Sequence, residues 1–326
     1  MTHKQHPIGS GFTAASTADE VLADIDLAGR NAIVTGGHAG IGLEVTRALA
    51  KAGASVTVAA RNPDRAKEAL AGIADVQVSR LDLIDPTSID AFANRWLESD
   101  RPLHILINGA GVTPPVELER DARGYEVQFA VNHLGHFQLT RDLLPALRAA
   151  GGARVVTVSS GAQRFCDIRW NDLHFDSGYQ QVVADAQSKT ANVLFSVELD
   201  RRYAGEGIRG YAAHPGVIAG TALNSSAGKE ALLAQGLIDE SGKAIIDPER
   251  GKKTPEQGAS TIVFAASSPL LSNIGGVYLK DNDISPLVDE DTPVSPDVIP
   301  SEVAPHSIDP QSAQRLWVLS EQLLRP

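Results

Sequence analysis

The feature that most limits how this chain can fold is a glycine-rich turn between a short apolar run and a helix-like segment. The run Ala32-Ile33-Val34 is followed by Thr35-Gly36-Gly37-His38-Ala39-Gly40-Ile41-Gly42, and a second apolar run occupies residues 55–60. This order predicts a βαβ unit. Small residues let the backbone approach a pyrophosphate, and the start of the helix supplies unpaired N–H groups. A glycine cluster alone indicates only a turn, but here it predicts a nucleotide site.

The alternation of short apolar runs and helix-length segments continues through most of the chain. Further runs occur at residues 76–81, 103–107, 154–158 and 210–213. We expect helices at residues 40–52, 64–73, 86–98, 119–150 (as two helices), 183–204 and 256–268. Such a pattern predicts an α/β fold with a Rossmann-type, doubly wound parallel sheet.

The length favours one such domain with additions at both ends. Of the 326 residues, we assign 1–28 to an N-terminal extension and 29–283 to the nucleotide-binding domain. Within that domain, residues of about 221–255 are expected to form a flap over the substrate. Residues 284–326, in which proline recurs before a helix-like end, are expected to form a C-terminal arm and helix.

Composition and charge narrow the classes of function. The net charge of −11 opposes binding to nucleic acid or to an anionic membrane surface. Cys166 is the only cysteine, which excludes an intrachain disulfide and gives no sign of a metal site. No apolar run approaches the roughly 18 residues of a membrane span, and the N-terminal residues do not resemble a signal peptide. A cytoplasmic protein is expected.

The turn has the spacing T-G-x-x-x-G-I-G and resembles that of the short-chain dehydrogenase/reductase family. The likeness extends over residues of about 26–279, and is strongest to the retinol-dehydrogenase-like and WW-domain-oxidoreductase-like branch. It implies a dinucleotide cofactor held at the carboxyl ends of the strands. Asp82-Leu83 would hold the adenine, and Pro215-Gly216-Val217 with Thr221 would hold the nicotinamide. The full expected set is Thr35, Gly36, His38, Gly40, Ile41, Gly42, Arg61, Asp82, Leu83, Asn108, Ala110, Gly111, Lys189, Pro215, Gly216, Val217 and Thr221.

The end of the second strand favours NADP(H) over NAD(H). An enzyme that uses NAD places an acidic residue there to bind the ribose 2′-hydroxyl. This chain has Ala60 followed by Arg61, and a guanidinium suits a 2′-phosphate. His38 in the glycine turn offers a further contact to that phosphate.

Resemblance to the family also places three parts of a catalytic group. Asn132, in Val131-Asn132-His133-Leu134-Gly135-His136, matches the asparagine of the family's water relay. Ser160 matches the serine that orients the substrate oxygen. Lys189 matches the lysine that lowers the pKa of a catalytic tyrosine and binds the nicotinamide ribose. That tyrosine lies four residues before the lysine in the family, and this chain has Asp185 there.

Four interpretations of Asp185 follow. Hydride transfer to a C=O of a small hydrophobic substrate persists, with desolvated Asp185 or a water held by Asn132 as the proton donor. Alternatively, the site reduces a protonated imine, and ionised Asp185 stabilises the cation. In the third case the protein binds NADP(H) without turnover. In the fourth, Asp185 is a deliberate substitution that makes the chain an active-site variant of a carbonyl reductase.

The sequence says less about the substrate and the partners. Leu223, Leu232, Leu233 and Leu237 in the flap suggest an apolar pocket, although they would serve equally well as core. His174, Phe175 and Tyr179 lie in the long insert before Asp185. Resemblance to the family implies a homodimer or homotetramer built on the helix that carries Lys189.

Overall fold

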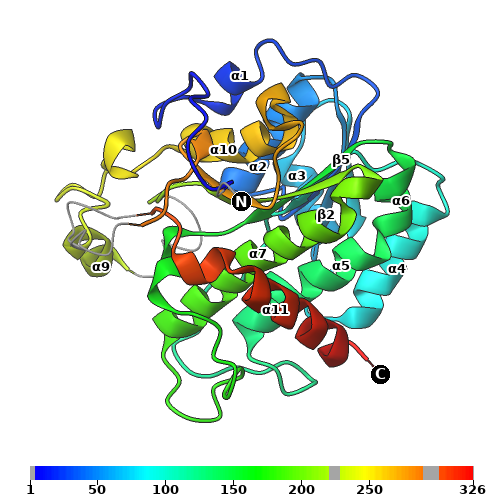
Figure 1. Cartoon of the computed structure of the whole chain (residues 1–326). Coiled ribbons are helices and arrows are strands. Elements are labelled where there is room, and N and C mark those ends of the chain that lie inside the picture. The colour runs from blue at the N-terminus through cyan, green and yellow to red at the C-terminus, as the bar shows by residue number, and fades with distance from the viewer. Residues whose placement is uncertain (1–3, 220–227, 289–300, 326) are drawn as a thin grey trace.

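The chain folds around one sheet with helices on both faces (Figure 1). The computed structural model describes residues 4–219, 228–288 and 301–325. In the described part the strand order is β3-β2-β1-β4-β5-β6-β7-β8, and only the pair β7 and β8 is antiparallel. The strands are β1 (Asn31–Thr35), β2 (Ser55–Ala60), β3 (Val76–Arg80), β4 (Ile105–Asn108), β5 (Ala153–Val158), β6 (Ile208–His214), β7 (Val277–Lys280) and β8 (Asp283–Ile284). The predicted Rossmann-type sheet is confirmed.

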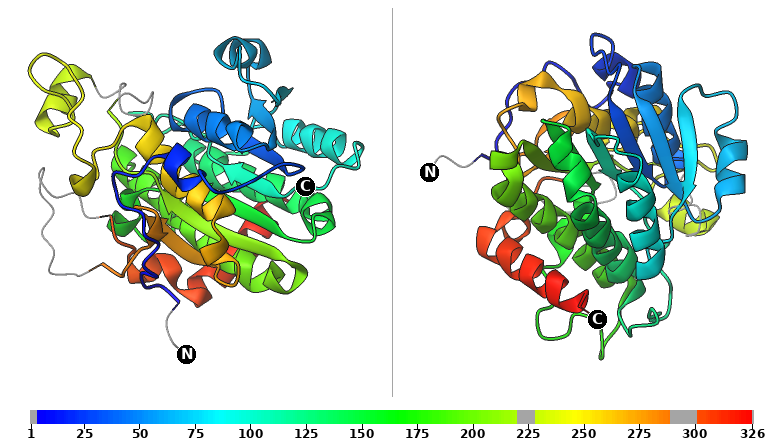
Figure 2. Two further views of the ribbon diagram at one scale, coloured as in Figure 1. Left: turned by 90° about the horizontal axis from the view of Figure 1, so that it is seen from above. Right: turned by 90° about the vertical axis from the view of Figure 1, so that its right-hand side faces the viewer.

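Two layers of helices cover the sheet (Figure 2). On one face lie α1 (Ala18–Val21), α2 (Gly40–Lys51) and α10 (Pro255–Ser267), which bury one apolar cluster against the strands. On the other face lie α4 (Pro86–Leu97), α5 (His136–Asp142), α6 (Leu144–Ala149) and α7 (Gln181–Tyr203), which bury a second cluster. The shorter α3 (Pro63–Ala69) joins β2 to β3. The strand order reverses between β1 and β4, where doubly wound sheets hold their ligands.

Local sequence explains where several helices begin. Asp85 accepts a hydrogen bond from the N–H of Thr87, and Pro86 follows as the first residue of α4. Thr254 and Gln257 form a reciprocal capping box at the start of α10. Both helices therefore start within one residue of where the sequence predicts.

The prediction of helix from residue 119 is wrong for its first turns. Residues 119–126 are not helical, and the helix begins after Glu126, whose carboxylate accepts from the N–H groups of Gln128 (2.9 Å) and Phe129 (2.8 Å). A side-chain acceptor at this position ends the preceding loop and caps the helix. A π-helical stretch, Phe129–Gly135, then leads into α5.

Both terminal extensions fold onto the domain. The Gln5 side chain donates to the carbonyl oxygens of Tyr278 and Ser285, both at 2.7 Å, and accepts from the N–H of Tyr278, so it pairs with the edge of the sheet. At the other end α11 (Pro310–Leu323) lies along α7 (Figure 1). The sheet extends to Ile284, one residue past the predicted end of the nucleotide-binding domain.

Among the helices of residues 4–219, 228–288 and 301–325, none combines the length and the apolar character that crossing a membrane requires.

Candidate active site

The glycine-rich turn joins β1 to α2 at the carboxyl edge of the sheet. Gly36 has a φ of +69°, in the left-handed region, and a Cβ there would lie 3.1 Å from the Cα of Ala110. A Cβ on Gly42 would collide with the carbonyl oxygen of Gly36. Gly40 begins α2, and Ala39 gives the helix no side-chain cap. The first N–H groups of α2, including those near Ile41, therefore remain open beside a backbone that admits a phosphate closely.

A positively charged corner lies beside this turn. Burial lowers the pKa of His38, and the nearby positive charges of Arg65 and Arg61 lower it further. The Nδ1 atom of His38 is buried and has no hydrogen-bond partner in the described part of the chain. β2 ends at Ala60, so no carboxylate stands where a 2′-phosphate would lie. The sequence analysis missed Arg65, which lies in the first turn of α3, four residues after Arg61.

Thr35, at the end of β1, holds the end of β4 in place. Its Oγ1 accepts hydrogen bonds from the N–H groups of Gly109 (2.9 Å) and Ala110 (3.0 Å). It also lies 2.9 Å from Nε2 of His136 and 3.2 Å from the carbonyl oxygen of Ile107. Because the two N–H groups fill its acceptor positions, the hydroxyl must donate its proton, and Nε2 is the nearer acceptor.

His136 connects this turn to Asn132. Its Nδ1 lies 3.0 Å from the carbonyl oxygen of Asn132 and must donate to it. Burial lowers the pKa of His136 to about 4, so the ring is neutral, with its proton on Nδ1 and Nε2 free to accept from Thr35. His136 was missed from the sequence, although it stands in the quoted motif four residues after Asn132.

Asn132 lies in the π-helical stretch, and both ends of its amide are used. Its Oδ1 accepts from the N–H of Val112 (3.2 Å), and its Nδ2 donates to Oγ of Ser188 (3.1 Å). Ser188 donates in turn to the carbonyl oxygen of Asp185 (2.8 Å). The Asn132 side chain thus ties the loop after β4 to the part of α7 that carries the site. Ser188, immediately before Lys189, was also missed.

Asn108 and Gly111 precede Val112, at the end of β4 and in the loop that follows it. Asn108 is buried at the end of β4, and its Nδ2 donates to Oγ1 of Thr140 (3.1 Å) on α5. A Cβ on Gly111 would lie 3.4 Å from Oδ1 of Asn132. The Asn108 contact ties the end of β4 to α5.

Asp185 and Lys189 lie one turn apart on α7, as predicted. Asp185 is partly buried, and its Oδ1 is buried without a hydrogen-bond partner in the described structure. Burial raises the pKa of the Asp185 carboxyl, and the ammonium of Lys189 opposes this less strongly. Burial thus favours the neutral, protonated acid.

No tyrosine takes the missing position. All five tyrosines lie in described parts of the chain, and Tyr179 lies outside α7, as expected. Its hydroxyl donates to the carbonyl oxygen of Pro115 at 2.9 Å. The other four lie elsewhere: three donate to the carbonyl oxygens of Leu323, Leu271 and Ser301, and Tyr203 packs on Trp317.

Ser160 follows β5 and begins the short helix η2 (Gly161–Phe165). Its Oγ accepts from the N–H of Ala162 (3.2 Å), which leaves the hydroxyl proton to donate elsewhere. The neighbouring Ser159 donates to the carbonyl oxygen of Lys189 (2.9 Å). The Ser159 hydrogen bond joins the end of β5 to α7, so Ser160 and Lys189 lie on adjoining elements.

The adenine end of the predicted site is a turn after β3. Oδ1 of Asp82 accepts from the N–H of Ile84 (3.3 Å), and the N–H of Asp82 donates to Ser88 (2.9 Å). Leu83 is buried against Gly135, where a Cβ would meet the Leu83 backbone. Leu83 thus borders the start of α5, whereas Asp82 is held by Ser88 of α4.

The nicotinamide end is a turn after β6. Gly216, after Pro215, has a φ of +82°. The N–H of Val217 donates to the carbonyl oxygen of Gly251 (2.7 Å), and its carbonyl oxygen accepts from the N–H of Lys253 (3.0 Å). Val217 therefore closes the base of the flap. Thr221 and Leu223 lie outside the described residues.

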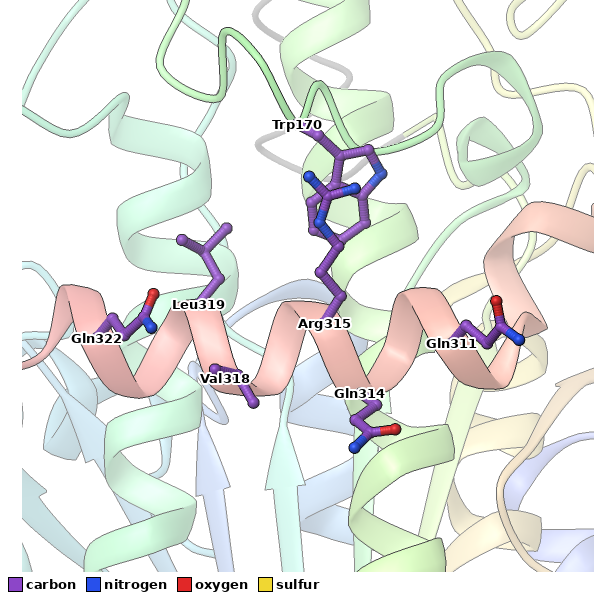
Figure 3. A pocket seen from close by; sticks show the side chains of 7 residues that line it. All are labelled: Trp170, Gln311, Gln314, Arg315, Val318, Leu319 and Gln322. Carbon is purple, nitrogen blue, oxygen red and sulfur yellow. The ribbon is translucent and has the colours of Figure 1, made fainter.

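A hollow of about 540 Å³ lies on the outer side of α11, and none of the predicted site residues lines it. Figure 3 shows the Arg315 guanidinium stacked on Trp170, 4.1 Å from the ring centroid. This hollow is separate from the site around Asp185.

Comparisons with known proteins identify the family of the chain. The short chain dehydrogenase family model matches residues 30–231. A probable oxidoreductase from Streptomyces lividans is 43 % identical over 90 % of this chain and 97 % of its own length. Retinol dehydrogenase 12 from Bos taurus is 36 % identical over 92 % of this chain and 88 % of its own. The structure titled Pseudomonas aeruginosa RhlG/NADP active-site complex is 25 % identical, with a TM-score of 0.61 over 78 % of this chain and 95 % of its own. On the strength of the glycine turn, the Asn132, Ser160 and Lys189 positions and these matches, the chain belongs to the short-chain dehydrogenase/reductase family of oxidoreductases.

Proposed function

We propose that this protein is an NADP(H)-dependent reductase of a C=O group in a small hydrophobic substrate, with Asp185 as the proton donor. The observation that carries this proposal is the buried Oδ1 of Asp185, which has no partner in the described structure and lies one helical turn before Lys189. A group free to donate a proton, beside the lysine that the family uses, is what the reaction requires.

The residues around the glycine turn fit NADP(H). Gly36 and Gly42 leave space where a side chain would obstruct a pyrophosphate, and the start of α2 faces that space with open N–H groups. Arg61 and Arg65 supply the positive charge that a 2′-phosphate needs, and His38, whose pKa burial and these arginines lower, offers that phosphate a hydrogen bond from a neutral ring. When bound, NADPH would supply the hydride, and the RhlG complex of the same family contains NADP.

The chain's own residues would then orient the substrate and supply the proton. The Ser160 hydroxyl, which accepts from Ala162, is free to donate to a carbonyl oxygen. Because burial raises the pKa of the Asp185 carboxyl, its protonated form would donate a proton to that oxygen as negative charge develops on it. Lys189 would hold the nicotinamide ribose and would stabilise the Asp185 carboxylate left after donation.

Imine reduction is the second candidate, because an unpartnered carboxylate oxygen also suits a cation. It requires Asp185 to be ionised before the substrate binds. Since burial raises the pKa of Asp185, carbonyl reduction is the first choice.

Two exposed valines, Val116 and Val182, support an apolar substrate better than the leucines of the flap do. Leu232, Leu233 and Leu237 pack with one another and with Val217 into a small cluster of their own. Val116 and Val182 are 83 % and 67 % exposed. The segments that carry them are joined, because Tyr179 and Gln181 donate hydrogen bonds to the loop after β4. An apolar substrate would meet these side chains at the entrance.

The test is NADPH consumption with hydrophobic ketones, aldehydes and cyclic imines, with NADH as the control cofactor and Asp185→Tyr as the matched variant. Ketone or aldehyde reduction by the natural chain, faster with NADPH than with NADH, supports the proposal. Turnover of imines alone would favour the second candidate. Ketone reduction only after Asp185→Tyr would show that the natural chain binds the cofactor without this reaction.

A further inference from the structure

Gln163 is a completely buried glutamine three residues after Ser160, and its amide is bonded to the C-terminal arm, residues 301–308. Its Oε1 accepts from Oγ of Ser307 (2.7 Å) and from the N–H of Ala304 (3.1 Å). Its Nε2 donates to the carbonyl oxygen of Glu302 (2.8 Å). A buried amide held by three partners from one segment has one orientation, because any other leaves polar groups unpaired.

The backbone of Gln163 connects the same arm to the site. Its N–H donates to the carbonyl oxygen of Ser160 (3.1 Å). Its carbonyl oxygen accepts from Oγ1 of Thr190 (2.8 Å), the residue after Lys189, and from Nε2 of His306 (2.9 Å). One residue therefore contacts the Ser160 turn, the Lys189 turn of α7 and the arm.

A chain of ion pairs forms a second connection from the arm. The Glu302 carboxylate lies 2.7 Å from Nζ of Lys280, which lies 3.6 Å from Asp281. Asp281 lies 2.6 Å from Nζ of Lys253, whose side chain is fully buried. The aliphatic part of Lys253 packs against Gly216, where a Cβ would lie 2.9 Å from Cδ of Lys253. Glu302 thus contacts Gln163 with its backbone and, through this chain, the turn at the nicotinamide end.

We propose that the C-terminal arm positions the reactive groups, and that Gln163 is the positioning residue through which it sets the Ser160 turn against Lys189. The arm lies outside residues 30–231, so it is an addition to the part that the family model describes. A displaced Ser160 would misalign the substrate oxygen in the transition state, while the glycine turn that holds the cofactor phosphates would be unchanged. This inference rests on the proposed reductase activity.

The test compares Gln163→Met with Gln138→Met, which removes another buried glutamine whose Nε2 donates to Pro86 (3.1 Å) and Asp90 (2.7 Å) away from the site. Both changes should lower Tm, because each leaves buried polar groups unpaired. Gln163→Met should lower kcat about tenfold or more with NADPH affinity unchanged, since a small misplacement of reacting groups is costly. Gln138→Met should leave kcat within about twofold. Ser307→Ala, on the arm, should lower kcat in the same direction by a smaller factor.

Each comparison is made both in the natural chain and with Asp185→Tyr, so that turnover need not depend on Asp185 as the donor. If only the Asp185→Tyr chain is active, the proposed role of Asp185 fails, and the positioning role is still decided by kcat in that background. Equal kcat for the Gln163→Met and Gln138→Met chains, despite equal losses of Tm, would overturn the positioning role.

Discussion

At the residue scale, the proposed role of Asp185 as proton donor depends on how deeply its carboxyl is buried. An exposed aspartate beside a lysine would be ionised and a poor acid. The sequence places Asp185 one turn from Lys189, which the structure confirms, but it does not show how deeply the carboxyl is buried. The part of α7 that carries Asp185 packs against the π-helical stretch of Asn132, which is distant in sequence, so the direction of the pKa of Asp185 required the fold.

The raised pKa of Asp185 makes a prediction about stability. Its ionisation favours the unfolded chain, so the free energy of unfolding should fall as pH rises from about 4, the ordinary pKa, through the folded pKa. If the pKa of Asp185 is raised by one, the free energy of unfolding above the folded pKa falls by about 1.4 kcal/mol. This corresponds to roughly 2–4 °C in Tm. Asp185→Asn should match the natural chain in acid and exceed its Tm at pH 8. Asp64→Asn, at an exposed carboxyl, should show no such crossover in thermal melts.

The proposed preference for NADP(H) depends on Arg61 and its neighbours. Arg61→Asp should weaken NADPH binding about ten- to hundredfold, since a charge-assisted hydrogen bond contributes about 1.5–3 kcal/mol. NADH binding should be maintained or improved. Arg30→Asp is the matched control, because Arg30 is an exposed arginine before β1, at the amino ends of the strands and away from the glycine turn. Equal losses for both cofactors, measured by titration, would contradict the assignment.

At the element scale, the π-helical stretch Phe129–Gly135 explains why part of the site could not be predicted. Helical periodicity indicates helix from residue 119, but Glu126 caps the helix later and the π-turn aims the Asn132 carbonyl at His136. The parallel strands and the glycine turn could be predicted because local pattern determines them. Contacts that join distant segments, such as Asn132 to Ser188, could not.

His136 and His133 lie on this stretch and provide a matched pair. His136 contacts Thr35 and Asn132, whereas His133 contacts Ser320 of α11 at 2.8 Å. Replacing either by leucine leaves buried groups unpaired, at about 1–3 kcal/mol for each. We expect both variants to lose Tm but only His136→Leu to lose NADPH affinity, which fluorescence titration would detect. Equal affinities would refute the link through Thr35.

The same histidines predict sensitivity to acid. Burial lowers the pKa of His133 to about 3 and that of His136 to about 4. Since the unfolded chain takes up their protons first, the free energy of unfolding should fall as pH drops from about 6.5 toward these values. In each leucine variant the slope of unfolding free energy against pH between 4 and 6 should be smaller.

At the scale of the whole molecule, the terminal extensions cover surfaces that the central domain would otherwise expose. Residues 4–10 lie along β7 and β8, and α11 covers α5 and α7. The expectation of a homodimer or homotetramer built on the helix of Lys189 stays a prediction, and α11 now lies over that helix. We therefore propose that any dimer of this chain forms through a face other than α7. Cross-linking from a position on α7 should then give no link between two copies.

Trp317 anchors α11 to the domain. Its ring stacks on Phe195 with centroids 5.8 Å apart and meets Phe137 edge-on at 4.8 Å. Trp317→Ala should cost about 3–5 kcal/mol of unfolding free energy. The next residue, Val318, is 41 % exposed, so Val318→Ala should change stability by about 0.5 kcal/mol or less. Chemical denaturation measures both, and similar small losses would mean that α11 contributes little.

The most direct test of Asp185 as the proton donor is the pH dependence of kcat for Asp185→Asn beside the natural chain, with NADPH affinity measured on both. In the natural chain we expect carbonyl reduction to slow as pH rises through the pKa of Asp185. In Asp185→Asn we expect a loss of about hundredfold or more, with NADPH binding unchanged. Turnover in Asp185→Asn at the natural rate and with the natural pH profile would contradict the account.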